Sequence, residues 1–271
     1  MKIYISFDFE GLAGVTNWKE TMNNAEYNLL ATEQLNTFLE GFFDAHPNGE
    51  VVVCDSHAYG TNLIYRKLVG NTRLIKGFPR EFYMMQNLDE SFEAIIYFGY
   101  HSPVGILGNM DHTYSSSLIY DIFINDKKVS EFCINSLLAA YYNIPVKFIF
   151  TDSATKEWIY KNVSDKIKIQ VSKDVISRYS AELYPYQQVL DELYKNGKNL
   201  DKLPDFYYPL LNDYKTKIIL TDTNIAYTVS IIPFVKRLDD RTVEFTADNP
   251  TNLYRKLLTV IFVGSSVKSV G

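Results

Sequence analysis

The chain has 271 residues, 46% of them hydrophobic, and a formal net charge of −5. This length allows one large domain or two modest ones with a full apolar core. A net negative charge without a basic stripe argues against nucleic acid or an anionic membrane surface as the main partner, so we expect a small or peptidic partner.

The N-terminal residues, MKIYISFDFE, carry charge where a signal peptide needs an unbroken apolar segment, and no later apolar run reaches the length of a membrane span. The two cysteines are too few for a disulfide framework and form no Cys-x-x-Cys pair. We therefore expect a cytoplasmic protein with no membrane partner, in which both cysteines are structural.

The first half of the chain alternates between strand-like and helix-like patterns. Apolar runs rich in β-branched and aromatic residues predict buried strands at residues 2–9, 51–54, 94–98 and 146–150. Helices are expected around residues 35–42, after Ser130 and after Asp152. This alternation predicts an α/β fold in which helices cover both faces of a mostly parallel sheet, giving three layers. Residues 119–124 predict a strand that enters a tight turn at an edge.

The pattern changes beyond about residue 165. We expect a polar helical stretch at 181–196, strands at 217–220, 226–232 and 242–245, and a final amphipathic helix at 253–262. These elements predict a smaller α+β C-terminal subdomain. We assign residues 1–155 to an α/β metal-binding catalytic domain and residues 156–271 to the subdomain, which we expect to serve oligomerisation and substrate access.

Polar side chains follow three of the expected strands where each strand ends. Side-chain alternation along the first strand separates Asp8 and Glu10 from its apolar face. His57 follows the second strand, and His101 follows the third, where Gly99 allows close approach of the backbone. Because ligands of open parallel sheets bind outside the carboxyl ends of the strands, we expect these donors to share one rim.

Three of the four histidines lie at or just after these strand ends, and Glu131 lies in the first turn of the helix after Ser130. Two imidazoles and three carboxylates suit a pair of divalent ions, with zinc as the first choice and manganese or cobalt as alternatives. The expected metal ligands are Asp8, Glu10, His57, His101 and Glu131. His112 lies in the long loop SPVGILGNMDHTYSSS and is left free to move protons or attack a carbonyl group.

Each of these features also has a purely structural interpretation. Asp8 and Glu10 suit a solvated strand end, His57 and His112 suit surface loops, and Glu131 suits a helix N-terminus. It is the joint occurrence of these donors at one rim that favours a metal site. The chain lacks a Gly-x-Gly-x-x-Gly after the first strand, a Walker loop and a Gly-x-Ser-x-Gly elbow, which argues against nucleotide binding and serine hydrolase chemistry. It also lacks a His-Glu-x-x-His motif, which argues against a metalloprotease of the common helical type.

The ordered set of motifs resembles a known family, the zinc-dependent D-aminopeptidases of the DppA type. The set comprises Asp8-Phe9-Glu10-Gly11, Asp55-Ser56-His57, Gly99-Tyr100-His101, Met110-Asp111-His112-Thr113 and Ser130-Glu131, and the resemblance covers about the first 155 residues. It implies two zinc ions per chain on the five ligands above and His112 as the catalytic histidine, proposed in the family as nucleophile. It also implies a ring-shaped homo-oligomer, a decamer. The family usually has a small residue where this chain has Asp111.

We therefore expect a metallo-aminopeptidase that hydrolyses short peptides with a D-amino acid at the amino end. Asp55 and Asp152 are expected to orient ligand imidazoles. The alternatives are another small-molecule metal-dependent hydrolase, such as a phosphoesterase or amidase, and a protein that binds metal and peptide without turnover.

Overall fold

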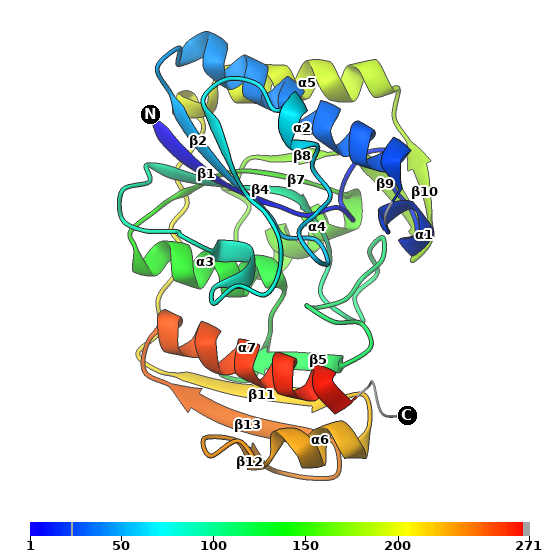
Figure 1. The fold of residues 1–271 in the computed structure, drawn as a ribbon, viewed down its shortest axis with the longest axis vertical. Coiled ribbons are helices and arrows are strands. Elements are labelled where there is room, and N and C mark those ends of the chain that lie inside the picture. The colour runs from blue at the N-terminus through cyan, green and yellow to red at the C-terminus, as the bar shows by residue number, and fades with distance from the viewer. Residues whose placement is uncertain (23, 268–271) are drawn as a thin grey trace.

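The computed structural model describes residues 1–22 and 24–267, and its largest element is a six-stranded sheet (Figure 1). The strand order is β3-β2-β1-β4-β7-β8, and every neighbouring pair is parallel. The strands are β1 (Lys2–Phe7), β2 (Glu50–Asp55), β3 (Thr72–Ile75), β4 (Ala94–Tyr100), β7 (Val146–Thr151) and β8 (Ile169–Val171). The four expected strands are confirmed, whereas β3 and β8 are short additions that the sequence pattern did not indicate.

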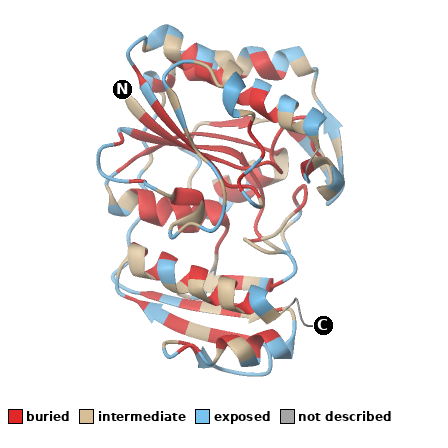
Figure 2. Ribbon diagram, viewed as in Figure 1, coloured by how far each residue is buried: buried red, intermediate tan, exposed pale blue. Residues whose placement is uncertain are grey.

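Helices cover both faces of this sheet, which confirms the three-layer α/β architecture. On one face lie α2 (Ala25–Ala45) and α5 (Tyr186–Lys198), which share one apolar core with alternate residues of β1. On the other face lie α3 (Glu131–Tyr141) and α4 (Ser153–Asn162). Figure 2 shows the strands between these layers as almost entirely buried, as expected of a parallel sheet covered on both sides.

A second, antiparallel sheet lies beyond α3, in the order β12-β13-β11-β5-β6. Its strands are β5 (Ile119–Ile124), β6 (Lys127–Lys128), β11 (Tyr214–Leu220), β12 (Lys236–Arg237) and β13 (Thr242–Ala247). The C-terminal helix α7 (Pro250–Ser266) lies between this sheet and α3 (Figure 1). The expected strand at 119–124 is confirmed, but it lies between β11 and the short edge strand β6, which it joins through the expected tight turn.

Two sequence expectations in the second half are wrong. Residues 226–232, expected as a strand, belong largely to helix α6 (Thr223–Val229), because the Asp222 side chain accepts a hydrogen bond from the backbone N–H of Ile225 and starts a helix there. The helix expected from residue 181 begins only at Tyr186. Residues before it form a hairpin of β9 (Lys173–Ser177) and β10 (Ser180–Leu183).

The two sheets draw on both halves of the chain. β5 and β6 contribute residues 119–128 to the smaller sheet, while β8 and α5 return residues beyond 165 to the larger unit. The division into a catalytic domain at 1–155 and a subdomain at 156–271 stays a prediction. The remaining described elements are α1 (Trp18–Thr21) and three 3-10 turns, η1 (Tyr65–Lys67), η2 (Tyr83–Met85) and η3 (Leu200–Lys202). None of the described helices has the length and apolar character needed to cross a membrane.

Candidate metal centre

The ends of β1 and β4 approach each other closely. The backbone N–H of Asp8 donates to the Phe98 carbonyl oxygen at 2.7 Å, and that of Gly11 donates to the Gly99 carbonyl oxygen at 2.7 Å. A Cβ atom on Gly99, which has a φ of +78°, would lie 2.1 Å from the Asp8 carbonyl oxygen. Only glycine fits this position, and the close approach brings Asp8 beside His101 at the end of β4.

All six expected site residues lie together at the carboxyl end of the main sheet. Their side chains are buried or nearly so, with His112 the most accessible at 11%. They come from the ends of three strands, from the first turn of α3 and from the loop at 102–117: Asp8, Glu10, His57, His101, His112 and Glu131. The predicted clustering of these side chains is therefore observed, whereas their roles as ligands and catalyst stay predictions.

Asp8 stands between two groups of potential ligands. Its Oδ1 is 3.3 Å from His57 Nδ1, which is also 3.1 Å from Glu10 Oε1. Its Oδ2 is 3.5 Å from His101 Nε2, which is also 3.4 Å from Glu131 Oε1. Each oxygen of one carboxylate thus faces a different histidine, the arrangement in which a carboxylate bridges two cations.

The spacing of these donors fits divalent zinc. Bonds of about 2.0–2.2 Å in tetrahedral geometry place neighbouring donors about 3.3–3.6 Å apart, and the contacts of Asp8 span 3.3–3.5 Å. His101 Nδ1 donates to the Ser102 carbonyl oxygen at 3.0 Å, so its buried Nε2 faces two carboxylates with a lone pair when the ring is neutral. These three donors, His101 Nε2 and the two carboxylates, can therefore accommodate a cation between them.

The cluster concentrates charge in a buried space. Burial and the charge of Glu10 raise the pKa of Asp8 to about 8. Burial alone would lower the pKa of His57, but the charge of Glu10 and hydrogen bonds to Asp8 and Glu10 raise it to about 10. The metal-free cluster therefore holds protons between its carboxylates and imidazoles, which bound cations would replace.

His112 differs electrostatically from the other two histidines of the cluster. Burial and the charge on His101 lower the pKa of His112 to about 4, so its ring is neutral near neutral pH. Its Nδ1 lies 3.0 Å from the Met110 carbonyl oxygen and donates to it, which leaves the Nε2 lone pair directed at the cluster. That Nε2 lies 3.9 Å from Glu10 Oε1 and 3.8 Å from Glu131 Oε1. The ring stacks on His101 with centroids 4.1 Å apart and meets the edge of Trp18 at 5.1 Å.

Asp55 and Asp152 do not orient imidazoles as we expected. Asp55 accepts hydrogen bonds from the backbone and side chain of Asn62, both at 2.7 Å, and so fixes the loop after His57. Asp152 caps α4 and accepts a hydrogen bond from the backbone N–H of Asn109 at 3.1 Å. Both carboxylates therefore hold the loops that carry the site rather than the rings.

Two positioning side chains escaped the sequence analysis because they come from the β9–β10 hairpin. Lys173 is fully buried, and its Nζ donates to the carbonyl oxygens of Glu10 at 2.6 Å, Leu12 at 2.8 Å and Val15. Arg178 contacts the loop that carries His112. No local pattern marks either residue, since a charged side chain on a short strand is normally exposed.

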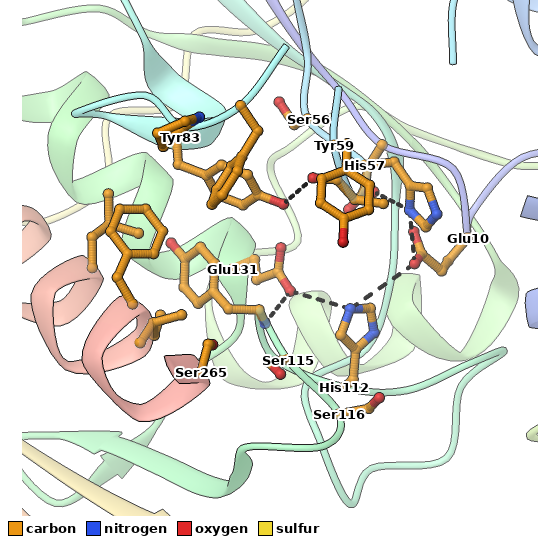
Figure 3. A pocket seen from close by; sticks show the side chains of 18 of the residues that line it. Glu10, Ser56, His57, Tyr59, Tyr83, His112, Ser115, Ser116, Glu131 and Ser265 are labelled. Carbon is orange, nitrogen blue, oxygen red and sulfur yellow. Dashed lines mark hydrogen bonds and ion pairs between the residues drawn. The ribbon is translucent and has the colours of Figure 1, made fainter. Parts of the chain in front are cut away.

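A cavity of about 700 Å³ opens on the cluster. Figure 3 shows Glu10, His57 and His112 on one side and Ser265 of α7 on the other side, with Glu131 between them and with Tyr83 and Tyr59 along a further edge. This volume lies in the range of about 300–1,000 Å³ that is common for small-ligand sites. The arrangement offers a floor of potential metal ligands, a neutral imidazole and enclosed space for a short substrate.

Comparison with known proteins adds three findings. The profile of the M55 peptidase family, described as D-aminopeptidase, matches residues 1–259. A D-aminopeptidase of Bacillus subtilis (strain 168) is 34% identical over 167 residues, which span 58% of this chain and 58% of that relative's length. The solved structure of the Zn-dependent D-aminopeptidase DppA from Bacillus subtilis, described as a self-compartmentalizing protease, matches with a TM-score of 0.89 and 24% identity and covers 98% of each chain. This likeness confirms the fold.

Proposed function

This chain belongs to the D-aminopeptidase family of peptidases, as its motifs predicted, and on that premise we propose that it is a metal-dependent aminopeptidase. It would hydrolyse the first amide bond of short peptides that carry a D-amino acid at the amino end. Two zinc ions would be held by the five expected ligands, Asp8, Glu10, His57, His101 and Glu131. The observation that carries the proposal is the position of the Asp8 carboxylate. One of its oxygens faces His57, after β2, and the other faces His101, after β4, while the neutral ring of His112 lies beside them.

Bound zinc ions would polarise the substrate carbonyl group and lower the pKa of the attacking water. The residues of the chain supply the proton transfers. His112 Nε2 is neutral and faces the cluster, so it can accept a proton as water attacks the amide carbon and then deliver it to the leaving amine. Glu10 and Glu131, at 3.9 and 3.8 Å, stabilise the imidazolium formed in between. The same nitrogen can also attack the carbonyl carbon directly. The amide C–N bond then breaks, the amine leaves with a proton taken from a water molecule, and the hydroxide so formed hydrolyses the acyl-histidine to the free acid and the neutral imidazole. Rapid-quench mass spectrometry would detect the acyl-histidine.

Self-association is part of the proposal. The similar structure is described as a self-compartmentalizing protease, which supports a homo-oligomer, and the family resemblance favours a ring-shaped decamer. Several large apolar side chains in, or directly after, β5, α6 and β12 are exposed in the single chain: Tyr120, Tyr227, Ile231 and Leu238. Burial of such residues between subunits would stabilise an assembly. Light scattering would measure the mass of the assembly directly.

A cytoplasmic location stays a prediction.

The test combines metal analysis with peptide assays on the purified protein. We expect two zinc ions per chain and faster release of amino acid from D-Ala-Gly-Gly than from its L-counterpart. His112→Ala should retain both ions and lose hydrolysis, whereas His46→Gln, outside the site, should retain both properties. Full activity of His112→Ala would contradict the catalytic assignment. Hydrolysis of p-nitrophenyl phosphate in place of peptides would favour the phosphoesterase alternative, and two bound ions without any hydrolysis would favour a binding protein.

A further inference from the structure

The cavity is chemically two-sided. Its floor is the candidate metal cluster, and the wall opposite is formed by α7, through Leu258, Ile261 and Phe262. Phe78 extends this wall, since its ring meets that of Phe262 edge to face with centroids 5.4 Å apart. The same ring also packs against Tyr83 at 6.0 Å. The wall is therefore a continuous apolar and aromatic surface.

This aromatic wall is open to the cavity rather than filled by the protein. Phe78 is 44% exposed and Tyr59, whose ring lies 6.2 Å from that of Phe78, is 66% exposed. Trp18, whose ring meets that of His112 at 5.1 Å, and Met22 add further apolar surface to the lining. Large exposed aromatic side chains around an enclosed space are typical of a ligand-binding surface.

Within residues 1–22 and 24–267, the lining of this cavity includes no lysine or arginine, and apart from tyrosines its ionisable groups all belong to the candidate metal cluster. A substrate carboxylate that lies away from the metal cluster, against the wall formed by α7, would lose water there without gaining an ion-pair partner. The cavity thus favours uncharged groups beyond the amine and the scissile amide.

We propose that the preferred substrates of this site are short peptides whose side chains next to the scissile amide are bulky and apolar, and whose C-terminal carboxylate is absent or distant. The inference rests on the proposed function, because it places the reacting amide over the metal cluster. Phe262, Ile261 and Phe78 are then the specificity-determining residues, since they meet the substrate side chains across the cavity.

The expected preference is large enough to measure. One methylene group more or less in a hydrophobic pocket corresponds to about 10- to 200-fold discrimination, and leucine and phenylalanine bury more than one such group beyond alanine. We expect kcat/KM for D-Leu-Gly-Gly amide and D-Phe-Gly-Gly amide to exceed that for D-Ala-Gly-Gly amide by about 10-fold or more. D-Glu-Gly-Gly amide should be the poorest of the series.

Variants of α7 test which residues set the preference. Phe262→Ala should reduce the ratio of D-Phe to D-Ala activity by about 5-fold or more. Val263→Ala is the matched control, because Val263 is the next residue of the helix and does not line the cavity. Ser265→Lys adds a cation at an exposed position of the rim and should raise kcat/KM for the D-Glu peptide by several-fold. Because Ser265 is exposed, this substitution tests the inference even if Phe262→Ala fails to fold.

Binding provides a second readout. Calorimetry of the zinc-loaded protein should show tighter binding of D-leucine hydroxamate than of D-alanine hydroxamate, by about 10-fold. Equal or faster hydrolysis of the D-Ala peptide, with equal binding of the two hydroxamates, would overturn the inference while leaving the proposed function in place. Absence of hydrolysis of every peptide in the series would instead contradict the proposed function and the inference with it.

Discussion

Arg178 binds both the side chain and the backbone of Asp111, the residue that precedes the candidate catalytic histidine, His112. Its Nε lies 3.1 Å from Asp111 Oδ1, and its guanidinium also donates to the Asp111 carbonyl oxygen at 2.8 Å. The Arg178 carbonyl oxygen accepts the backbone N–H of Met110 at 2.8 Å, and the Met110 carbonyl oxygen accepts from His112 Nδ1. Hydrogen bonds through Met110 thus connect the β9–β10 hairpin to the imidazole. A second connection is the contact of Arg178 with Asp111, at the position where the family resemblance leads us to expect a small residue.

We predict that Arg178→Ala lowers kcat about 10-fold with little change in zinc content, because small displacements of a catalytic group are costly in rate. Arg178 is 43% exposed, so the effect on stability should be small. The double variant with Asp111→Asn should be no worse than the poorer single variant, since both remove the same contact. Arg73→Ala removes a surface pair with Glu50 and serves as control. Additive losses would contradict a shared role.

Lys173 should couple stability to metal binding. Lys173→Met leaves three buried carbonyl oxygens without their donor, each costing about 1–3 kcal/mol, so we expect the free energy of unfolding to fall by about 3 kcal/mol or more. Zinc affinity should fall as well, because the backbone of Glu10 is released. Denaturant titration and zinc titration measure the two effects.

Lys147→Met is the matched control for this prediction. Lys147 is also nearly buried and donates to the Leu203 carbonyl oxygen and to Asp205, both at 2.8 Å, away from the cluster. It should lose stability and keep zinc affinity. If Lys147→Met and Lys173→Met weaken zinc binding equally, the positioning role of Lys173 is wrong.

A single methyl group should separate the ends of β1 and β4. Gly99→Ala places a Cβ atom 2.1 Å from the Asp8 carbonyl oxygen, in addition to the strain of a positive φ. Gly77→Ala meets the same kind of strain at φ +94° with no atom within 4 Å of the new carbon. We expect a loss of about 1 kcal/mol for Gly77→Ala and a distinctly larger loss, with weaker zinc binding, for Gly99→Ala. Equal losses by denaturant titration would argue against the close approach.

The metal-free protein should lose stability as the pH rises from about 6.5 to about 8. Folding raises the pKa of His57 to about 10 and that of Asp8 to about 8, so in this window the folded state holds protons that the unfolded state releases. Stability contributed by such groups is present at lower pH and is lost as the pH rises. Denaturant titration in chelator at pH 6.5 and 8 should show the loss in the wild type and a smaller one in His57→Gln. An unchanged pH dependence in that variant would refute the assignment.

The local pattern of the sequence predicts the main strands of the parallel sheet and the polar residues that follow them. The apolar runs locate β1, β2, β4 and β7, and the polar residues after three of these strands meet because parallel strands end at one edge. Glu131 joins them through the first turn of a helix whose cap, Ser130, is visible in the sequence. The sequence therefore predicts the site residues, because residues that follow different strands of a parallel sheet lie at the same edge of the sheet.

What the sequence does not predict depends on contacts between distant segments. Lys173 meets the loop after β1 from more than 150 residues away, and Arg178 holds a loop 67 residues distant. The residues of α6 have the composition of a strand, and only the cap at Asp222 and packing against α7 select the helix. Residues of α7 line the cavity only because the helix packs beside the site in the folded protein, and no sequence motif indicates this.

We propose that one carboxylate, Asp8, joins two cation sites. Crystals grown with zinc and measured on both sides of the zinc absorption edge would reveal both sites. We expect two anomalous peaks per chain, one among Asp8, Glu10 and His57 and the other among Asp8, His101 and Glu131, and both should vanish in Asp8→Asn. A single peak that persists in Asp8→Asn, or no peak within this cluster, would contradict it.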